Sequence, residues 1–158
     1  MSQTRNTLVL TMLALATACT GESVTAPVER LAGGHCVTTV TVVGSDSTSL
    51  TLGISGVCDL EQLGHTTMVA TQTVSTLNGA IINSTTYTAA NGDKLTSAFA
   101  GQATSPPGPD VVFTGTETYK SGTGRFQVVS GSSALDGTAT LSGATGTGQY
   151  TTKGTIKY

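Results

Sequence analysis

Threonine is the most frequent residue of this chain and occupies 32 of its 158 positions. Its branched β-carbon is crowded in a helix and fits the pleated surface of a strand. Residues 48–54, with the sequence TSLTLGI, alternate apolar and polar side chains with a period of two, which is the pattern of a half-buried strand. The composition and the periodicity together predict an all-β protein.

The same pattern predicts further strands, which turn residues separate. Asn78-Gly79 and Asn91-Gly92 are expected to form type I′ hairpin turns, because Asn and Gly tolerate a positive φ. The proline-rich residues 105–109 are predicted to be a loop, and residues 59–65 are the one place where a helical turn fits. The further strands are predicted at residues 36–43, 66–76, 81–88, 94–103, 111–119, 125–129, 134–141 and 149–158.

Eight or nine strands without a long helical period predict an antiparallel sandwich or barrel. Only 10% of the residues are charged, so an open sheet would have weakly protected edges. Closure removes the edges, which favours a single antiparallel barrel of about eight strands, with residues 149–158 as the closing strand. Its only phenylalanines, Phe99, Phe113 and Phe126, are expected to be buried.

The N-terminal residues resemble an export signal. Residues 8–18, LVLTMLALATA, form an apolar run that is too short to cross a bilayer, for which about 20 residues are needed. The run ends in Ala-Thr-Ala directly before Cys19, a pattern that resembles the lipobox of bacterial lipoproteins. An ordinary signal peptide followed by an incidental cysteine is the alternative interpretation.

The lipobox resemblance implies a signal peptide at residues 1–18 and a lipid on Cys19. It places the protein in a bacterial cell envelope, attached to a membrane through its lipid and facing the periplasm or the exterior. Residues 19–34 are predicted to be a flexible tether, since they begin with a polar stretch without periodicity, and residues 35–158 are predicted to be the barrel domain.

The two remaining cysteines, Cys36 and Cys58, are predicted to form a disulfide in an oxidising compartment. The bond would staple the open, solvent-exposed end of a hairpin. A pair of buried free thiols is the alternative. The spacing contains no CxxC motif and therefore does not indicate a redox-active pair or a zinc site.

Charge excludes some classes of protein. A net charge of −2 argues against nucleic-acid binding, which needs a face rich in Lys and Arg. The scarcity of charged residues also argues against a soluble helical bundle. The sequence predicts no cofactor and no metal ion.

Candidate catalytic groups are few. The disulfide would bring His35 near Asp59, and a His–carboxylate pair can act as a base or as two metal ligands, but no third ligand with a recognisable spacing follows. Glu117 shares a strand face with Phe113 and could point into a barrel. No motif assigns Glu117 a catalytic role, and a hydrogen-bonded or solvent-facing glutamate is the simpler interpretation. We predict no catalytic residue.

Residues 114–126, with Ser130-Gly131 and the Thr/Gly-rich final hairpin, resemble the C-terminal half of dirigent and allene-oxide-cyclase-like barrels. In that superfamily a Gly-Thr-Gly-x-Phe element lies between strands, and Gly122, Thr123, Gly124 and Phe126 match it. The resemblance covers the last third of the chain and implies a calycin- or dirigent-like eight-stranded barrel. Independently of it, the element is a glycine turn followed by a phenylalanine that can plug one barrel end.

Three functions are compatible with the sequence. The first is a non-enzymatic envelope lipoprotein whose barrel is a structural or interaction module, which the absence of a catalytic constellation favours. The second is a carrier of a small apolar ligand, which requires an open interior lined by Leu, Val and Phe. The third, by resemblance, is a cyclase- or isomerase-like enzyme, which requires a polar or acidic group inside the cavity. The sequence identifies no protein partner.

Overall fold

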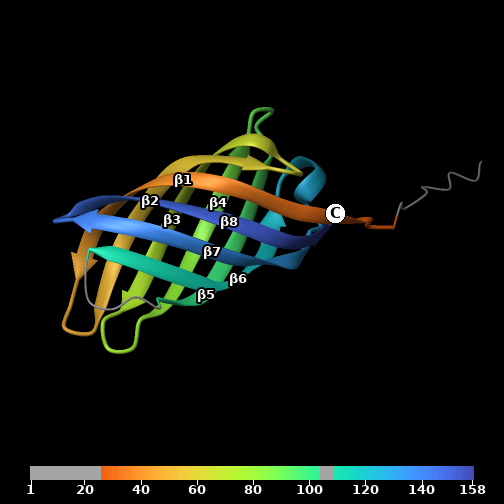
Figure 1. Cartoon of the computed structure of the whole chain (residues 1–158). Helices are drawn as coiled ribbons and strands as arrows, with labels where there is room; N and C mark the ends of the chain where they lie inside the picture. The colour runs from red at the N-terminus through yellow and green to blue at the C-terminus, as the bar shows by residue number, and fades with distance from the viewer. Residues whose placement is uncertain (1–25, 104–108) are drawn as a thin grey trace, which may run out of the picture.

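The computed structural model of the chain describes residues 26–103 and 109–158. Over these residues the chain forms one closed β-barrel of eight strands and a single 3-10 turn, η1, at Gly124–Phe126 (Figure 1). The strands are β1 (Glu29–Ser45), β2 (Ser49–Leu60), β3 (Gly64–Ser75), β4 (Ala80–Ala89), β5 (Lys94–Ala103), β6 (Asp110–Gly122), β7 (Ser130–Ser142) and β8 (Thr145–Lys157).

Every strand is antiparallel to its neighbour in sequence, and β8 returns to pair with β1. The closing ladder runs from Glu29 opposite Lys157 to Thr41 opposite Thr145, and β8 pairs with β7 along its other edge. The expected all-β fold, the antiparallel barrel and the closing role of the last strand are confirmed. Closure leaves no strand edge unpaired in the described barrel, which is the reason that a weakly charged sheet favours it.

Side chains alternate between the inside and the outside of the barrel along each strand. The interior is mainly apolar and includes Leu52, Met68, Tyr87 and Leu135, but a few polar side chains such as Glu117 are also buried there. The outward positions are mostly threonine, serine and charged residues, in agreement with the period-two pattern of the sequence.

Glycines on the inner face make room for aromatic rings. A β-carbon on Gly101 would lie 2.3 Å from Cζ of Phe99, and one on Gly115 would lie 2.7 Å from Cε2 of the same ring. Phe99 is buried and packs edge-on against Phe113, with 6.5 Å between the ring centroids. Phe113 itself is only partly buried, so the expectation that it is a core residue was wrong in degree.

The barrel has one end closed by an aromatic plug. Phe126 in η1 is fully buried and packs against Tyr158, with ring centroids 4.8 Å apart. The last strand therefore ends beside the plug (Figure 1). The strand expected at residues 125–129 was wrong, because the chain turns through η1 here; the plugging role expected of Phe126 is confirmed.

Two further expectations were wrong in local detail. β1 begins at Glu29, so residues 29–34 pair with β8 instead of belonging to the tether. Residues 61–63 form the turn between β2 and β3 without a helix.

The Asn-Gly pairs lie in turns as expected, but the turns are not type I′. Gly79 and Gly92 have φ values of +71° and +87°, whereas no described residue other than glycine has a positive φ. Each asparagine side chain instead accepts a hydrogen bond from the backbone two residues later: Ala80 N donates to Asn78 at 3.1 Å, and Asp93 N donates to Asn91 at 3.0 Å.

Cys36 and Cys58 form the expected disulfide, with a Cα–Cα distance of 4.1 Å. They are directly opposite each other on β1 and β2. Their side chains are 0% and 1% exposed, so the bond lies inside the barrel and not at an exposed hairpin end, where we had expected it.

No helix in the described part of the chain is long and apolar enough to cross a membrane. The predicted signal peptide and Cys19, as well as most of the expected proline-rich loop, lie outside the described residues.

Candidate functional site

The barrel encloses a cavity of about 190 Å³. Its wall includes Leu50, Val74 and Leu141, which are only partly buried and lie at the end that carries the β1–β2, β3–β4 and β7–β8 turns. The cavity therefore approaches solvent at this end, opposite the Phe126 plug. Apolar side chains make up most of the lining: Val40, Leu50, Leu52, Ile54, Met68, Val74, Ile81, Phe99, Ala103, Val111, Phe113, Leu135, Ala139 and Leu141.

A buried carboxyl group forms the floor of this cavity. Glu117 on β6 is 2% exposed and points inward, with two hydroxyl groups donating to its Oε1. The Tyr87 hydroxyl from β4 lies 2.7 Å away, and the Ser97 hydroxyl from β5 lies 2.6 Å away. Glu117 and Tyr87 also line a smaller void of about 20 Å³ on the side of the plug.

The hydroxyl groups form a chain that ends at the carboxyl group. The Tyr150 hydroxyl from β8 lies 3.0 Å from the Tyr87 hydroxyl. Because the Tyr87 proton is directed to Glu117, Tyr150 donates to Tyr87. The Tyr150 hydroxyl also lies 3.9 Å from the sulfur of Cys58, which places the disulfide next to this network.

Burial raises the pKa values of the carboxyl and phenol groups in this network. Loss of solvent raises the pKa of Glu117 above its ordinary value, while the Ser97 and Tyr87 hydroxyls oppose the shift by stabilising the charged form. The pKa values of Tyr87 and Tyr150 are also raised, first by burial. Burial raises the pKa of Tyr119, which shares the β6 inner face, to about 12. The three tyrosines are therefore neutral hydrogen-bonding groups at physiological pH.

The period-two pattern predicted the correct strand face for Glu117, and we expected its carboxyl group to be hydrogen-bonded or to face solvent. The structure excludes solvent exposure: the carboxyl group is buried and hydrogen-bonded. The roles of Tyr87, Tyr150 and Ser97 were missed. The period-two pattern puts each of these side chains on the inner face of its strand. Their contacts with one another depend on how β4, β5, β6 and β8 are arranged in the closed barrel, which the pattern of a single strand does not specify.

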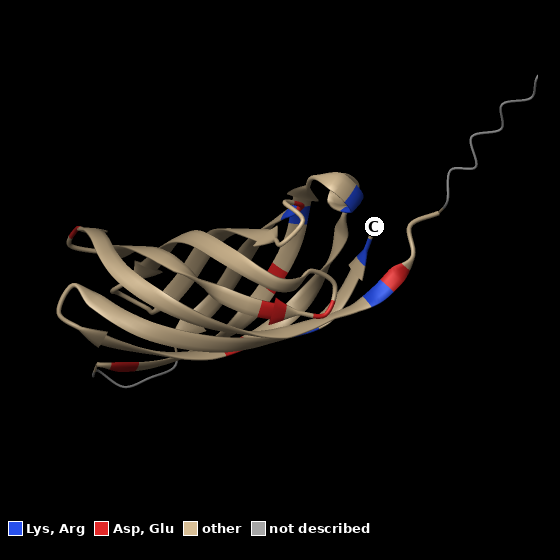
Figure 2. Ribbon diagram, turned by 90° about the horizontal axis from the view of Figure 1, so that it is seen from above, with Lys and Arg blue, Asp and Glu red and all other residues tan. Residues whose placement is uncertain are grey.

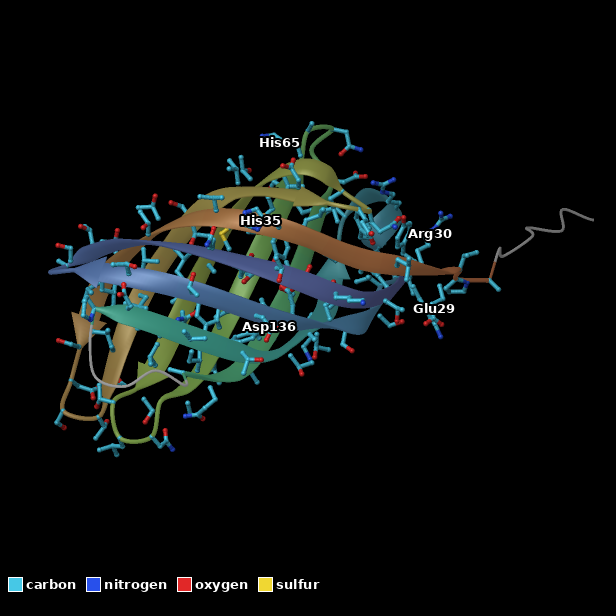
Figure 3. All side chains as sticks on the ribbon, in the orientation of Figure 1. Glu29, Arg30, His35, His65 and Asp136 are labelled. Atoms are coloured by element: carbon cyan, nitrogen blue, oxygen red, sulfur yellow. A yellow bond between two sulfur atoms is a disulfide. The ribbon has the colours of Figure 1, made fainter. Side chains whose placement is uncertain are left out.

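The histidines lie outside the barrel. His35 is opposite Asp59 in the β1–β2 ladder, as the disulfide pairing implies, but Asp59 bonds to His65, with 2.9 Å between Oδ1 and Nδ1. The His65 and Asp59 side chains are 71% and 81% exposed, so this pair contributes little to stability. Both histidines are exposed, His35 on β1 and His65 on β3 (Figure 3).

No group of three or more His, Cys, Asp or Glu side chains within residues 26–103 and 109–158 is arranged to hold a metal ion. The one acidic group of the cavity lining, Glu117, has hydroxyl groups as its partners. The described site is thus an apolar cavity with a hydrogen-bonded carboxyl group at its floor.

Comparison with known proteins found no matching family model, no matching curated protein and no matching solved structure.

Proposed function

We propose that this barrel binds a small, mainly apolar molecule in its interior and is held in the cell envelope by a lipid on Cys19. The observation that carries the proposal is the cavity of about 190 Å³, whose wall is mainly apolar, with Gln72 and Asn83 among its few polar side chains, and whose floor carries Glu117. A few polar groups in a largely apolar pocket are typical of small-molecule sites, where the apolar wall supplies affinity and the polar groups fix orientation. The interior of an eight-stranded barrel is either filled by side chains or holds one small ligand, and the unfilled volume here favours the second case.

The volume limits the size of the ligand. An apolar protein cavity of about 150 Å³ admits benzene. The cavity here is somewhat larger, so a substituted single ring or a short branched chain would fit without rearrangement. A long lipid chain or a polycyclic molecule would need the barrel to expand.

The geometry of the barrel is compatible with a tether at the closed end. β1 begins at the end that carries the Phe126 plug, so the described chain starts at that end. The cations of the described residues, Arg30, Lys94, Lys120, Arg125, Lys153 and Lys157, also lie toward this end (Figure 2). An anchor on Cys19 would then leave the open end of the cavity facing away from the membrane.

Binding is tested by titrating the full chain with toluene and following methyl resonances of the cavity leucines by NMR. Ala139→Trp, which fills the cavity from β7, is expected to abolish binding. Ala134→Trp on the outer face of the same strand is the matched control and should bind as the wild type does. Absence of any toluene-dependent shift in the wild type would refute the proposed binding function.

Attachment is tested by mass spectrometry of the membrane fraction from a bacterial host. The mature chain is expected to begin at a lipidated Cys19, and Cys19→Ser should release the protein or leave the precursor uncut. An unmodified Cys19 in a soluble protein would contradict the anchoring part of the proposal and leave the cavity argument intact.

A further inference from the structure

The floor of the cavity carries an acidic group without a basic partner. Among the residues that the structure describes, no Lys, Arg or His lines the cavity. The groups that face Glu117 are the hydroxyls of Tyr87 from β4, Ser97 from β5 and Tyr150 from β8, with Tyr119 beside it on β6. A buried carboxylate is costly unless it is hydrogen-bonded and paired with a positive charge.

The hydrogen bonds around Glu117 are arranged to receive negative charge. Both donors end on Oε1, at 2.6 and 2.7 Å, and hydrogen bonds donated to a carboxylate oxygen stabilise its charged form. Tyr150 donates to Tyr87 and adds a third hydroxyl dipole with the same direction. Within residues 26–103 and 109–158 no hydrogen bond to Oε2 is found and no fully buried side-chain oxygen lacks a partner, so Oε2 borders open space inside the barrel. One carboxylate oxygen is therefore stabilised by the protein, and the other has no donor.

We infer that the cavity is selective for a small organic cation, an apolar molecule with a protonated amine that donates to Oε2 of Glu117. This inference rests on the proposed binding function and adds the chemical class of the ligand. The ammonium group supplies both the missing positive charge and the missing donor. The apolar wall formed by Leu52, Ile54 and Leu135 contacts the hydrocarbon part.

The alternative ligand is a neutral molecule with a carbonyl group, which would accept a hydrogen bond from a protonated Glu117. That arrangement leaves two hydroxyl donors directed at a neutral carboxyl oxygen, where their contribution is smaller than at a charged one. An anionic ligand would be repelled by an ionised Glu117. We therefore predict that cationic ligands bind the cavity most tightly, neutral ligands less tightly and anionic ligands least tightly.

The test uses three probes of one size, benzylammonium, benzyl alcohol and benzoate, titrated calorimetrically into the full chain. We expect benzylammonium to bind at least about tenfold more tightly than benzyl alcohol, a difference of about 1.4 kcal/mol. Glu117→Gln should remove this preference, whereas Asp136→Asn, which removes a negative charge from the outer face of β7, should leave it unchanged. Figure 3 shows Asp136 on the outside of the barrel.

The probe ranking in the wild type tests the inference even if Glu117→Gln fails to fold. Equal or tighter binding of benzyl alcohol or benzoate relative to benzylammonium would overturn the assignment of a cationic ligand, while the proposed apolar binding function would stand. Binding of toluene without binding of benzylammonium would have the same meaning. Failure of toluene and of all three probes would instead refute the binding function itself.

A second readout is the pH dependence of benzylammonium binding. The cation should bind more tightly as the pH rises through the titration of Glu117, because the carboxyl group must release its proton to pair with the ammonium group. Benzyl alcohol should show no such rise. An affinity for benzylammonium that stays constant across the titration would contradict pairing with an ionised Glu117.

Discussion

Replacing both disulfide cysteines, in the variant Cys36→Ala/Cys58→Ala, tests the role of a crosslink inside the barrel. The two cysteines are 22 positions apart in the sequence, and for a loop of this length the chain-entropy estimate gives about 3 kcal/mol. The two sulfur atoms are also buried next to Tyr150, so their removal leaves a void and adds a packing cost. The expected loss of unfolding free energy is about 3–5 kcal/mol.

Urea unfolding followed by far-UV circular dichroism measures both parts of this effect. The midpoint should fall, and the dependence of the free energy on urea should become steeper, because the unfolded chain without the crosslink exposes more surface. The native wild type provides the control: its buried disulfide should resist a reductant until urea unfolds the barrel. A double variant within about 1 kcal/mol of the wild type and with an unchanged slope would refute the reasoning.

The remaining predictions concern packing and charge inside the barrel. Phe126→Ala should cost about 3–5 kcal/mol in urea unfolding, since the ring is fully buried, and Phe113→Ala should cost less because its ring is only partly buried. Gly101→Ala should destabilise by about 1–3 kcal/mol, because its β-carbon would overlap the Phe99 ring; wild-type stability would contradict the close packing. Folding raises the pKa of Glu117 above its ordinary value of 4.5. Between pH 4.5 and the raised pKa, the folded protein therefore binds more protons than the unfolded chain. The free energy of unfolding consequently falls as the pH rises through this interval. The free energy of unfolding of the wild type, measured with urea, should therefore fall relative to that of Glu117→Gln over this interval, and the difference should be constant below it. Parallel pH profiles of the two proteins would exclude a raised pKa.

Much of the barrel was predictable because its signals are local. Period-two alternation at residues 48–54 puts Leu52 inside, and the structure confirms that Leu52 is buried. The Asn-Gly pairs mark turns because glycine alone accepts the positive φ that these turns require. The disulfide was predictable by elimination, since two cysteines remained once Cys19 was assigned to the lipid.

The start of β1 and the path of residues 125–129 were not predictable from local patterns. Residues 29–34 lack a clear alternation and are held in a strand by pairing with β8, a partner more than 100 residues away in the chain. Residues 125–129 are apolar enough for a strand, but the Phe126 side chain points inward, covers the barrel end and packs against Tyr158. Long-range burial decided both cases.

By itself, the sequence determined the class of fold, the approximate strands and the disulfide, because β-branched residues, alternation and turn residues act within a few positions of one another. Only the tertiary structure decided that the interior contains a cavity and that Glu117 meets Tyr87, Ser97 and Tyr150 at its floor. These side chains come from four strands: pairing of β4, β5 and β6 brings Tyr87, Ser97 and Glu117 together, and closure of the barrel places the Tyr150 hydroxyl of β8 3.0 Å from that of Tyr87. Closure and register are properties of the whole set of strand pairs, so no single segment of the sequence specifies them.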